Sequence, residues 1–270
     1  MTRSPPDRTA PPIIDPPSTD PETDPWAPLR GLTRARVGQP RAGDTVAGGE
    51  VLAFQLAHAR ARRAVMAPLR QQALALDGPV LPVCSQAADR ATFIRRPDLG
   101  RRLSADSAAR LPRGRYDVAF VIADGLSALA AERQAPPVLA ACRALLPGWR
   151  IAPVVVAHNA RVALGDDIAH RLGAGCVVMM IGERPGLSVS DSLSLYMTWD
   201  PRPGRLDSER NCISNIHDHG GLSAEAAAAR LAGLLAGARR LGRSGIALKD
   251  ETPASEPDRK WGLARESGTQ

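Results

Sequence analysis

Short apolar runs alternate with helical patterns through the middle of the chain. Apolar runs within residues 117–125, 151–157 and 176–181 predict buried strands. Residues 127–146 and 164–172 carry helical patterns between these strands, and the first helix is expected in two pieces because two prolines interrupt it. Strands that alternate with helices in this way predict an α/β fold with parallel pairing and right-handed crossovers.

On the N-terminal side of this region the pattern predicts mainly helices. Residues 29–37 indicate a short helix, and residues 50–67 indicate a longer one with an interrupted apolar stripe along one face. Pro68 ends the longer helix because proline cannot continue the hydrogen-bonding pattern. Residues 80–83 predict a short strand that Pro82 interrupts.

On the C-terminal side the pattern becomes more polar. Residues 191–199 predict a helical turn that leads into a strand, whereas residues 210–216 form a polar segment with a cysteine near its centre. Ser223 is expected to cap a helix that ends at Gly242, and residues 245–248 are expected to add a last strand.

These elements group into four segments. Residues 1–25 are rich in Pro, Asp and Thr and low in apolar residues, which predicts a disordered tail. We expect a helical N-terminal region at 26–90. A Rossmann-like domain, with a mostly parallel sheet flanked by helices, is expected at 91–250, and a flexible C-terminal tail at 251–270.

The basic charge of the chain changes this picture little. Its 35 Lys and Arg residues exceed its 28 Asp and Glu residues and give a net charge of +7, but nearly all the basic residues are arginines spread among acidic ones. Aromatic residues, at 3% of the chain, are also too few for a base-stacking platform. We therefore expect no nucleic-acid partner, and an acidic partner surface or a phosphate group suits the charge better.

Membrane-spanning proteins, secreted proteins and zinc sites are not expected either. No apolar run reaches the length of a transmembrane helix, and the N-terminal residues lack the apolar stretch of a secretory signal. The four cysteines, Cys84, Cys142, Cys176 and Cys212, lie far apart and form no C-x-x-C pair. Cys142 and Cys176 lie in apolar segments, which indicates buried, reduced thiols.

The main candidate chemistry lies in the loop after the apolar run at 176–181. Glu183 and Arg184 follow this run between two glycines, and Pro185 cannot continue the strand. Ligands of open α/β sheets bind just beyond the carboxyl ends of strands, so Glu183 is a candidate binding residue. The alternative is an ordinary surface ion pair between the two charged side chains.

Two further segments carry candidate chemistry. The arginine-rich residues 92–103 form either a turn set by proline or an arginine-lined rim that faces a partner or an anionic group. A nucleophilic role for Cys212 would need a base, and neither His217 nor His219 is visibly placed to act as one, which favours a small packed or ligand-contacting residue. The glycine motifs G-x-G-x-x-G after a strand and G-x-x-x-x-G-K-[ST] are missing, which disfavours standard dinucleotide and Walker-type sites.

Five short segments, taken in order, resemble the small (light) subunit of ethanolamine ammonia-lyase. The resemblance spans residues 28–249, and the ordered set is far more specific than any one of its members. The segments are residues 32–37 (LTRARV), 96–101 (RPDLGR), 123–127 (ADGLS), 182–186 (GERPG) and 210–216 (RNCISNI).

The resemblance implies a subunit of an adenosylcobalamin-dependent lyase that converts ethanolamine to acetaldehyde and ammonia by a radical route. A separate large subunit with a TIM barrel would bind the substrate ethanolamine and carry most of the chemistry, and the small subunit would close over the cobalamin. The family's cobalamin contacts correspond to Val162, Glu183 and Cys212, and no catalytic or metal-ligating residue is expected in this chain. The implied location is a bacterial microcompartment or the cytoplasm.

The residues themselves are consistent with this implication. A corrin ring is rimmed with amide groups that donate hydrogen bonds, so Glu183 is a suitable acceptor, while Val162 and Cys212 offer apolar surface. The chain lacks the D-x-H-x-x-G motif that supplies a histidine to cobalt, so either the cofactor keeps its own benzimidazole, as the family implies, or cobalamin does not bind. The chain also differs from the family before Val162, where Asn159 and its two neighbours replace a segment containing glycine.

Two other functions remain open. A stand-alone Rossmann-like enzyme acting on a nucleotide or phosphate substrate would be active without a partner, although the missing glycine motifs disfavour it. A purely structural partner would assemble with the large subunit without changing the affinity for cobalamin.

Overall fold

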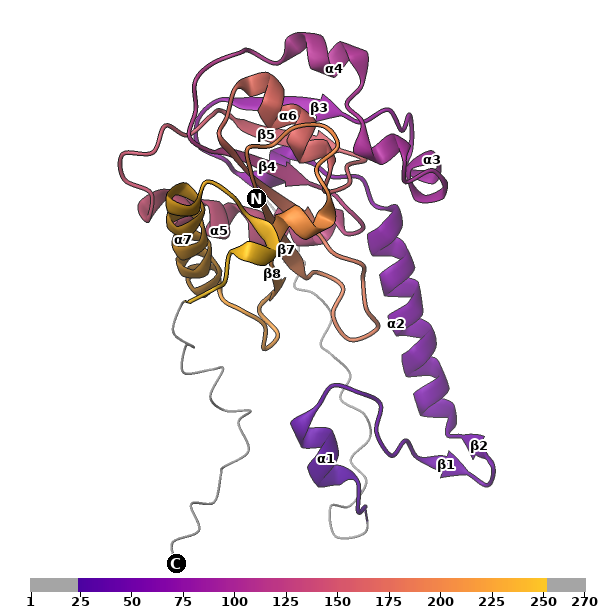
Figure 1. Ribbon diagram of the computed structural model, residues 1–270. Coiled ribbons are helices and arrows are strands. Elements are labelled where there is room, and N and C mark those ends of the chain that lie inside the picture. Colours follow the sequence, from indigo (N-terminus) through magenta and orange to yellow (C-terminus); the bar gives the residue numbers. More distant parts are fainter. Residues whose placement is uncertain (1–23, 252–270) are drawn as a thin grey trace, which may run out of the picture. The chain divides into compact units, whose positions relative to one another are not determined.

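A computed structural model describes residues 24–251 and has an α/β fold (Figure 1). The described residues divide between Ala59 and Arg60 into two compact units. Residues 1–23 and 252–270, which include nearly all of the two predicted tails, lie outside the described residues.

The N-terminal unit contains a helix, a two-stranded antiparallel hairpin and most of a longer helix. The guanidinium carbon of Arg36 lies 5.4 Å from the centroid of the Phe54 ring, which in turn stacks on His58. Both helices predicted in this region are confirmed, although the first ends earlier than expected. The elements are α1 (Ala27–Leu32), β1 (Arg41–Ala42), β2 (Thr45–Val46) and α2 (Gly48–Met66).

The larger unit is built on a six-stranded sheet in the order β3-β5-β4-β6-β7-β8. The pairs from β3 to β6 are parallel, whereas β7 pairs antiparallel with both of its neighbours. The sheet is therefore mixed, and the predicted parallel pairing holds for four of its strands. The strands are β3 (Val80–Cys84), β4 (Ala119–Ala123), β5 (Val154–His158), β6 (Cys176–Gly182), β7 (Leu193–Trp199) and β8 (Arg210–Ile216).

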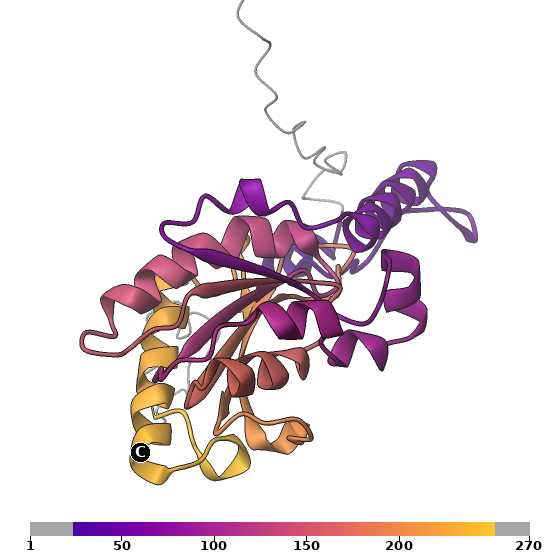
Figure 2. The ribbon, with the colours of Figure 1, turned by 90° about the horizontal axis from the view of Figure 1, so that it is seen from above.

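Helices cover both faces of this sheet (Figures 1 and 2). α5 and α7 pack on one face, where Phe120 and Ile122 of β4 contribute to their core cluster. α6 packs on the other face against a second cluster, to which the alternate residue Val121 belongs. The helices are α3 (Arg90–Arg95), α4 (Ala105–Arg110), α5 (Ala128–Ala144), α6 (Leu164–Leu172) and α7 (Ala224–Leu241), with 3-10 helices η1 (Gln71–Leu74), η2 (Leu99–Arg101), η3 (Asp207–Glu209) and η4 (Gly245–Ala247).

Three predictions of local structure were wrong. α5 is one helix that contains Pro136 and Pro137, because buried residues before and after the prolines hold both halves against the same face of the sheet. The last strand predicted at 245–248 is the 3-10 helix η4. Residues 191 and 192 precede β7 without forming the predicted helical turn. The polar segment at 210–216, for which no element was predicted, is the strand β8, whose backbone pairs with β7.

Membrane-crossing helices are not found among residues 24–251, since none there is both long enough and apolar enough.

Candidate functional site

Glu183 lies directly beyond the carboxyl end of β6 and is half-buried. Gly182, the last residue of β6, packs so closely against the turn after β4 that an added Cβ would overlap the carbonyl oxygen of Ser127. The carbonyl of Gly182 accepts a hydrogen bond from the N–H of Leu126 at 2.9 Å, and the N–H of Glu183 donates to Ser192 O at 2.9 Å. These contacts fix the backbone that presents the Glu183 carboxylate.

Tyr196 links Glu183 to Cys212. In β7 it lies opposite Met179 of β6 on one side and opposite Cys212 of β8 on the other. Its hydroxyl donates a hydrogen bond to Glu183 Oε1 at 3.0 Å. Tyr196 is half-buried and Cys212 is exposed. The structure thus brings two of the three predicted cofactor contacts to one side of the sheet, with an unpredicted tyrosine beside both.

The surroundings keep Tyr196 and Cys212 protonated near neutral pH. Burial raises the pKa of Tyr196, and negative charge raises it further, on Cys212 once that thiol ionises and on Glu183. Burial of its inner side raises the pKa of the Cys212 thiol, and the Glu183 carboxylate acts in the same direction. A thiol with a raised pKa is a poor nucleophile, so Cys212 is suited to contact a ligand rather than to attack one.

A row of polar side chains on β7 was not predicted. Along this strand, Ser194 and Tyr196 alternate with Leu193, Leu195 and Met197, which belong to the core cluster under α5 and α7. The hydroxyl of Ser194 is buried and has no hydrogen-bond partner among residues 24–251. The strict alternation of apolar and polar residues is the sequence signal that could have placed both residues on the opposite face.

Val162 lies in the loop after β5 and packs, like Tyr196, against the cluster under α6. Asn159 in this loop has a φ of 53°, in the left-handed region that glycine and asparagine tolerate. Its N–H donates to Asp124 Oδ2 at 2.8 Å, and its side-chain Nδ2 donates to Ala87 O at 3.3 Å. Asparagine therefore takes the conformation that a glycine would supply before Val162. β4 separates β5 from β6, so Val162 and Glu183 share a face but lie on different loops.

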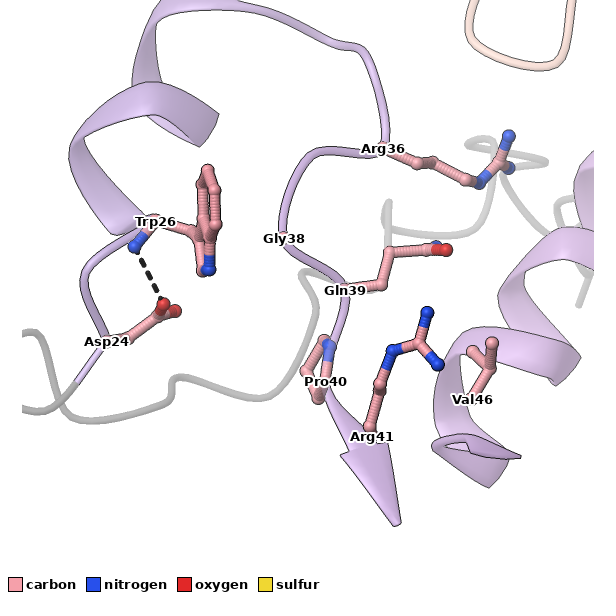
Figure 3. A pocket seen from close by; sticks show the side chains of 8 residues that line it. All are labelled: Asp24, Trp26, Arg36, Gly38, Gln39, Pro40, Arg41 and Val46. Atoms are coloured by element: carbon pink, nitrogen blue, oxygen red, sulfur yellow. Dashed lines mark hydrogen bonds between the residues drawn. The ribbon is translucent and has the colours of Figure 1, made fainter. Parts of the chain in front are cut away.

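The predicted cofactor contacts belong neither to a hollow in the N-terminal unit nor to a cluster of metal-binding side chains among the described residues. A hollow of about 690 Å³ lies in the N-terminal unit, where Trp26 stands on one side of the backbone at Gly38 and the side chains of Arg36 and Gln39 lie on the other (Figure 3). Its lining residues are Asp24, Trp26, Arg36, Gly38, Gln39, Pro40, Arg41 and Val46. Within residues 24–251, no group of three or more His, Cys, Asp or Glu side chains is arranged to hold a metal ion.

Comparison with known proteins gives one consistent family. A family model described as "Ethanolamine ammonia-lyase light chain (EutC)" matches residues 23–249. A protein of Rhodococcus erythropolis named ethanolamine ammonia-lyase small subunit is 48% identical over 237 residues, which cover 85% of this chain and 91% of that protein. Proteins of the same name from Azotobacter vinelandii and Ralstonia nicotianae are 47% identical over 249 residues and 45% identical over 251 residues. Each match covers 87% of this chain, with 91% of the first protein and 93% of the second. The family that the ordered segments suggested is confirmed, and the chain belongs to the ethanolamine ammonia-lyase light-chain family.

Proposed function

We propose that this chain is the small subunit of an ethanolamine ammonia-lyase which, assembled with a large subunit, converts ethanolamine to acetaldehyde and ammonia with adenosylcobalamin as cofactor. The family match over residues 23–249 is the observation that carries this proposal. In this proposal, residues 91–250 form a Rossmann-like domain that contacts the cobalamin where the two subunits meet. The enzyme would work in the cytoplasm or in a bacterial microcompartment.

The residues on one face of β7 and β8 suit a corrin ring. The ring is rimmed by amides that donate hydrogen bonds, and a carboxylate has about four acceptor positions, of which Tyr196 uses one on Glu183. The buried, unpartnered hydroxyl of Ser194 can donate or accept one more hydrogen bond. Cys212, exposed opposite Tyr196, offers a small apolar surface. Hydrogen-bonding groups beside apolar surface are what an amide-rimmed ring requires.

The division of labour follows from these side chains. Bound adenosylcobalamin supplies the radical chemistry. Tyr196 donates a hydrogen bond to Glu183 Oε1 and so restricts the orientation of the carboxylate, whose other acceptor positions would be available to the amide donors of the cofactor. Val162 and Cys212 contact apolar parts of the cofactor and exclude water from them. In this proposal the residues of this chain bind and orient, and none of them makes or breaks a substrate bond.

Ammonia release from ethanolamine in the presence of adenosylcobalamin tests the assembled function. This chain, the large subunit and the mixture of the two are assayed separately. Activity only in the mixture supports the proposal. Turnover by this chain alone, of ethanolamine or of a nucleotide or phosphate substrate, would show a stand-alone enzyme instead.

The role of Glu183 is tested by cobalamin binding to the assembled enzyme in equilibrium dialysis. Glu183→Ala is expected to raise the Kd about 10- to 100-fold, because a hydrogen bond to a charged acceptor contributes roughly 1.5–3 kcal/mol. Tyr196→Phe should raise it about two- to tenfold, since only the positioning hydrogen bond is lost.

Glu225→Ala removes an exposed carboxylate in the first turn of α7 and serves as the matched control, with an unchanged Kd expected. If Glu183→Ala assembles with the large subunit and binds cobalamin as tightly as the control, the chain is better described as a purely structural partner.

A further inference from the structure

The carboxyl ends of β4 and β5 lie side by side where the sheet changes its winding direction. α5 follows β4 and packs on one face, while α6 follows β5 and packs on the opposite face. Such a switch point is the usual ligand position in open α/β sheets. The residues that gather there come from the loop after β5, from α3 and from η2.

Two arginines from separate segments share one aromatic ring at this position. Arg90 of α3 and Arg161 of the loop after β5 both lie over Phe93, with guanidinium carbons 4.8 and 4.4 Å from the ring centroid. The N–H of Arg161 donates to Gly100 O at 2.8 Å, and a Cβ added at Gly100 would come within 2.8 Å of the Phe93 ring. The packing of these segments therefore holds both positive charges close together.

The nearest carboxylate does not neutralise both arginines. Asp124 Oδ2 lies 3.2 Å from Arg90 Nη1, but the same carboxylate also accepts the N–H groups of Asn159 at 2.8 Å and Ala160 at 3.0 Å. Arg90 Nη2 and Arg161 Nε are buried without hydrogen-bond partners in the described part of the chain. In that part, no carboxylate lies within ion-pairing distance of Arg161, and Asp124 acts on it only from farther away.

Arg101 of η2 adds to the excess of positive charge. Burial lowers the pKa of Arg161, and the nearby charges of Arg90 and Arg101 lower it further. The acidic residues of this segment are engaged elsewhere, since Asp89 caps α3 through the N–H of Thr92 at 2.7 Å and Asp98 pairs with Arg96 at 2.7 Å. One carboxylate, Asp124, thus faces several arginines, and it also accepts two backbone N–H groups. An excess of partly buried positive charge is unfavourable, and a bound anion would relieve this cost.

We propose that Arg161, together with Arg90 and Arg101, forms a binding site for a phosphate group at this switch point. Guanidinium groups donate paired hydrogen bonds that match the spacing of phosphate oxygens. The phosphate comes either from the phosphodiester in the nucleotide part of cobalamin or from free phosphate. The first source rests on the proposed function, and Arg161 directly precedes Val162, a predicted contact of the same cofactor.

Inorganic phosphate tests the site without any cobalamin. Thermal unfolding of the full chain is followed with phosphate or chloride added at equal ionic strength. Phosphate is expected to raise the melting temperature of the wild-type chain by binding the native state. Arg161→Gln should abolish this shift and the exposed Arg101→Gln should reduce it. Arg240→Gln, which removes an exposed charge in the last turn of α7, should retain it.

A pair of corrin ligands tests, in the complex with the large subunit, whether the site binds the phosphodiester of cobalamin. Cobalamin carries the nucleotide phosphate, and cobinamide has the same corrin ring without it. Arg161→Gln is expected to raise the Kd for cobalamin at least about tenfold and to change the Kd for cobinamide less than about twofold. Arg240→Gln should change neither value.

The two measurements separate the possible results. Loss of the phosphate shift together with a selective loss of cobalamin affinity supports the cofactor as the source, and loss of the phosphate shift alone supports free phosphate. If the shift survives in Arg161→Gln and cobalamin and cobinamide are affected equally, or not at all, the site does not exist. A wild-type complex that binds no cobalamin refutes the proposed function, and the phosphate shift still decides whether this site is present.

Discussion

A buried ion pair joins the two segments that carry Val162 and Cys212. Arg210 begins β8, and Asp166 lies in the first turn of α6. Nη1 and Nη2 of Arg210 each donate to one carboxylate oxygen of Asp166 at 2.7 Å, and the two side chains are 3% and 1% exposed. Asp166→Asn preserves the size of the side chain but removes the buried counter-ion and leaves Arg210 with the exposed carboxylate of Asp207, whose Oδ1 lies 3.3 Å from Arg210 Nε.

The loss of stability in Asp166→Asn depends on the contacts that Arg210 keeps. Removing one partner of a buried pair costs about 3–5 kcal/mol. Arg210 keeps its hydrogen bonds to Thr198 Oγ1 at 2.8 Å and to Arg205 O at 3.0 Å, as well as the exposed Asp207 carboxylate. We therefore expect a cost near the lower end, about 3 kcal/mol. At roughly 2–4 °C per kcal/mol for a domain of this size, Asp166→Asn should lower the melting temperature by about 6–12 °C.

Thermal unfolding followed by circular dichroism at neutral pH measures this effect. Asp106→Asn is the matched control, because Asp106 pairs with Arg110 at 3.0 Å on the exposed surface of α4 and should contribute at most about 0.5 kcal/mol. Combining Asp166→Asn with Arg210→Met removes the stranded charge and should recover part of the lost stability. If Asp166→Asn lowers the melting temperature no more than Asp106→Asn, the reasoning from buried charge is wrong.

Three further predictions concern pH, backbone packing and thiols. Arg150 donates to Asp117 Oδ1 at 3.0 Å and holds the pKa of that carboxyl below its ordinary 3.8. The carboxylate therefore stabilises the fold above the unfolded pKa and loses this effect as the pH falls through the folded pKa. Asp117→Asn should accordingly cost at most about 1 kcal/mol near neutral pH and less in urea titrations at progressively lower pH. Gly182→Ala should cost about 1–3 kcal/mol in the same assay and weaken cobalamin binding, because its Cβ meets the carbonyl of Ser127. A thiol reagent should label only the exposed cysteines of the native chain near neutral pH, since burial raises the pKa of Cys142 to about 12 and that of Cys176 further still.

Each of these predictions has a clear contrary result. An Asp117→Asn effect that grows as the pH falls would show that the carboxylate destabilises the folded state. Unchanged stability of Gly182→Ala would mean that the end of β6 shifts freely. Reaction of four thiols rather than two before unfolding would contradict the burial of Cys142 and Cys176.

The central strands could be predicted from the sequence because a strand that is buried on both faces consists of a continuous run of apolar residues. β4 and β6 are buried along their whole length, and their apolar runs were recognised without further information. β8 has no such apolar run, since its buried residues Arg210 and Ile213 are separated by polar and exposed ones. The strand is defined by its pairing with β7, which is a long-range interaction that local patterns do not encode.

The candidate site was predicted in part for the same reason. A carboxylate beyond the end of a buried strand is visible in a sequence, so Glu183 was found. Tyr196 acquires its role only when β7 folds back antiparallel on β6 and brings its hydroxyl to Glu183. The pairing of Arg210 with Asp166 likewise joins residues 44 positions apart, which no spacing rule connects.

The outer edge of the sheet at β3 has a backbone that is largely closed to further pairing. The N–H of Ser85 donates to His158 O at 3.2 Å, toward β5, so the alternate residues Pro82 and Cys84 direct their backbone nitrogens outward. Proline has no N–H to donate, and the N–H of Cys84 already donates to Ser107 Oγ at 2.9 Å.

An exposed strand edge is a template on which another chain can add a strand and start an aggregate. The proline that interrupts the pattern at 80–83 removes a donor from this edge without costing the sheet a hydrogen bond. A subunit that spends time unassembled after synthesis therefore has little tendency to polymerise through β3. At this edge, recognition of another chain is left to side chains, which can discriminate between partners where a bare backbone cannot.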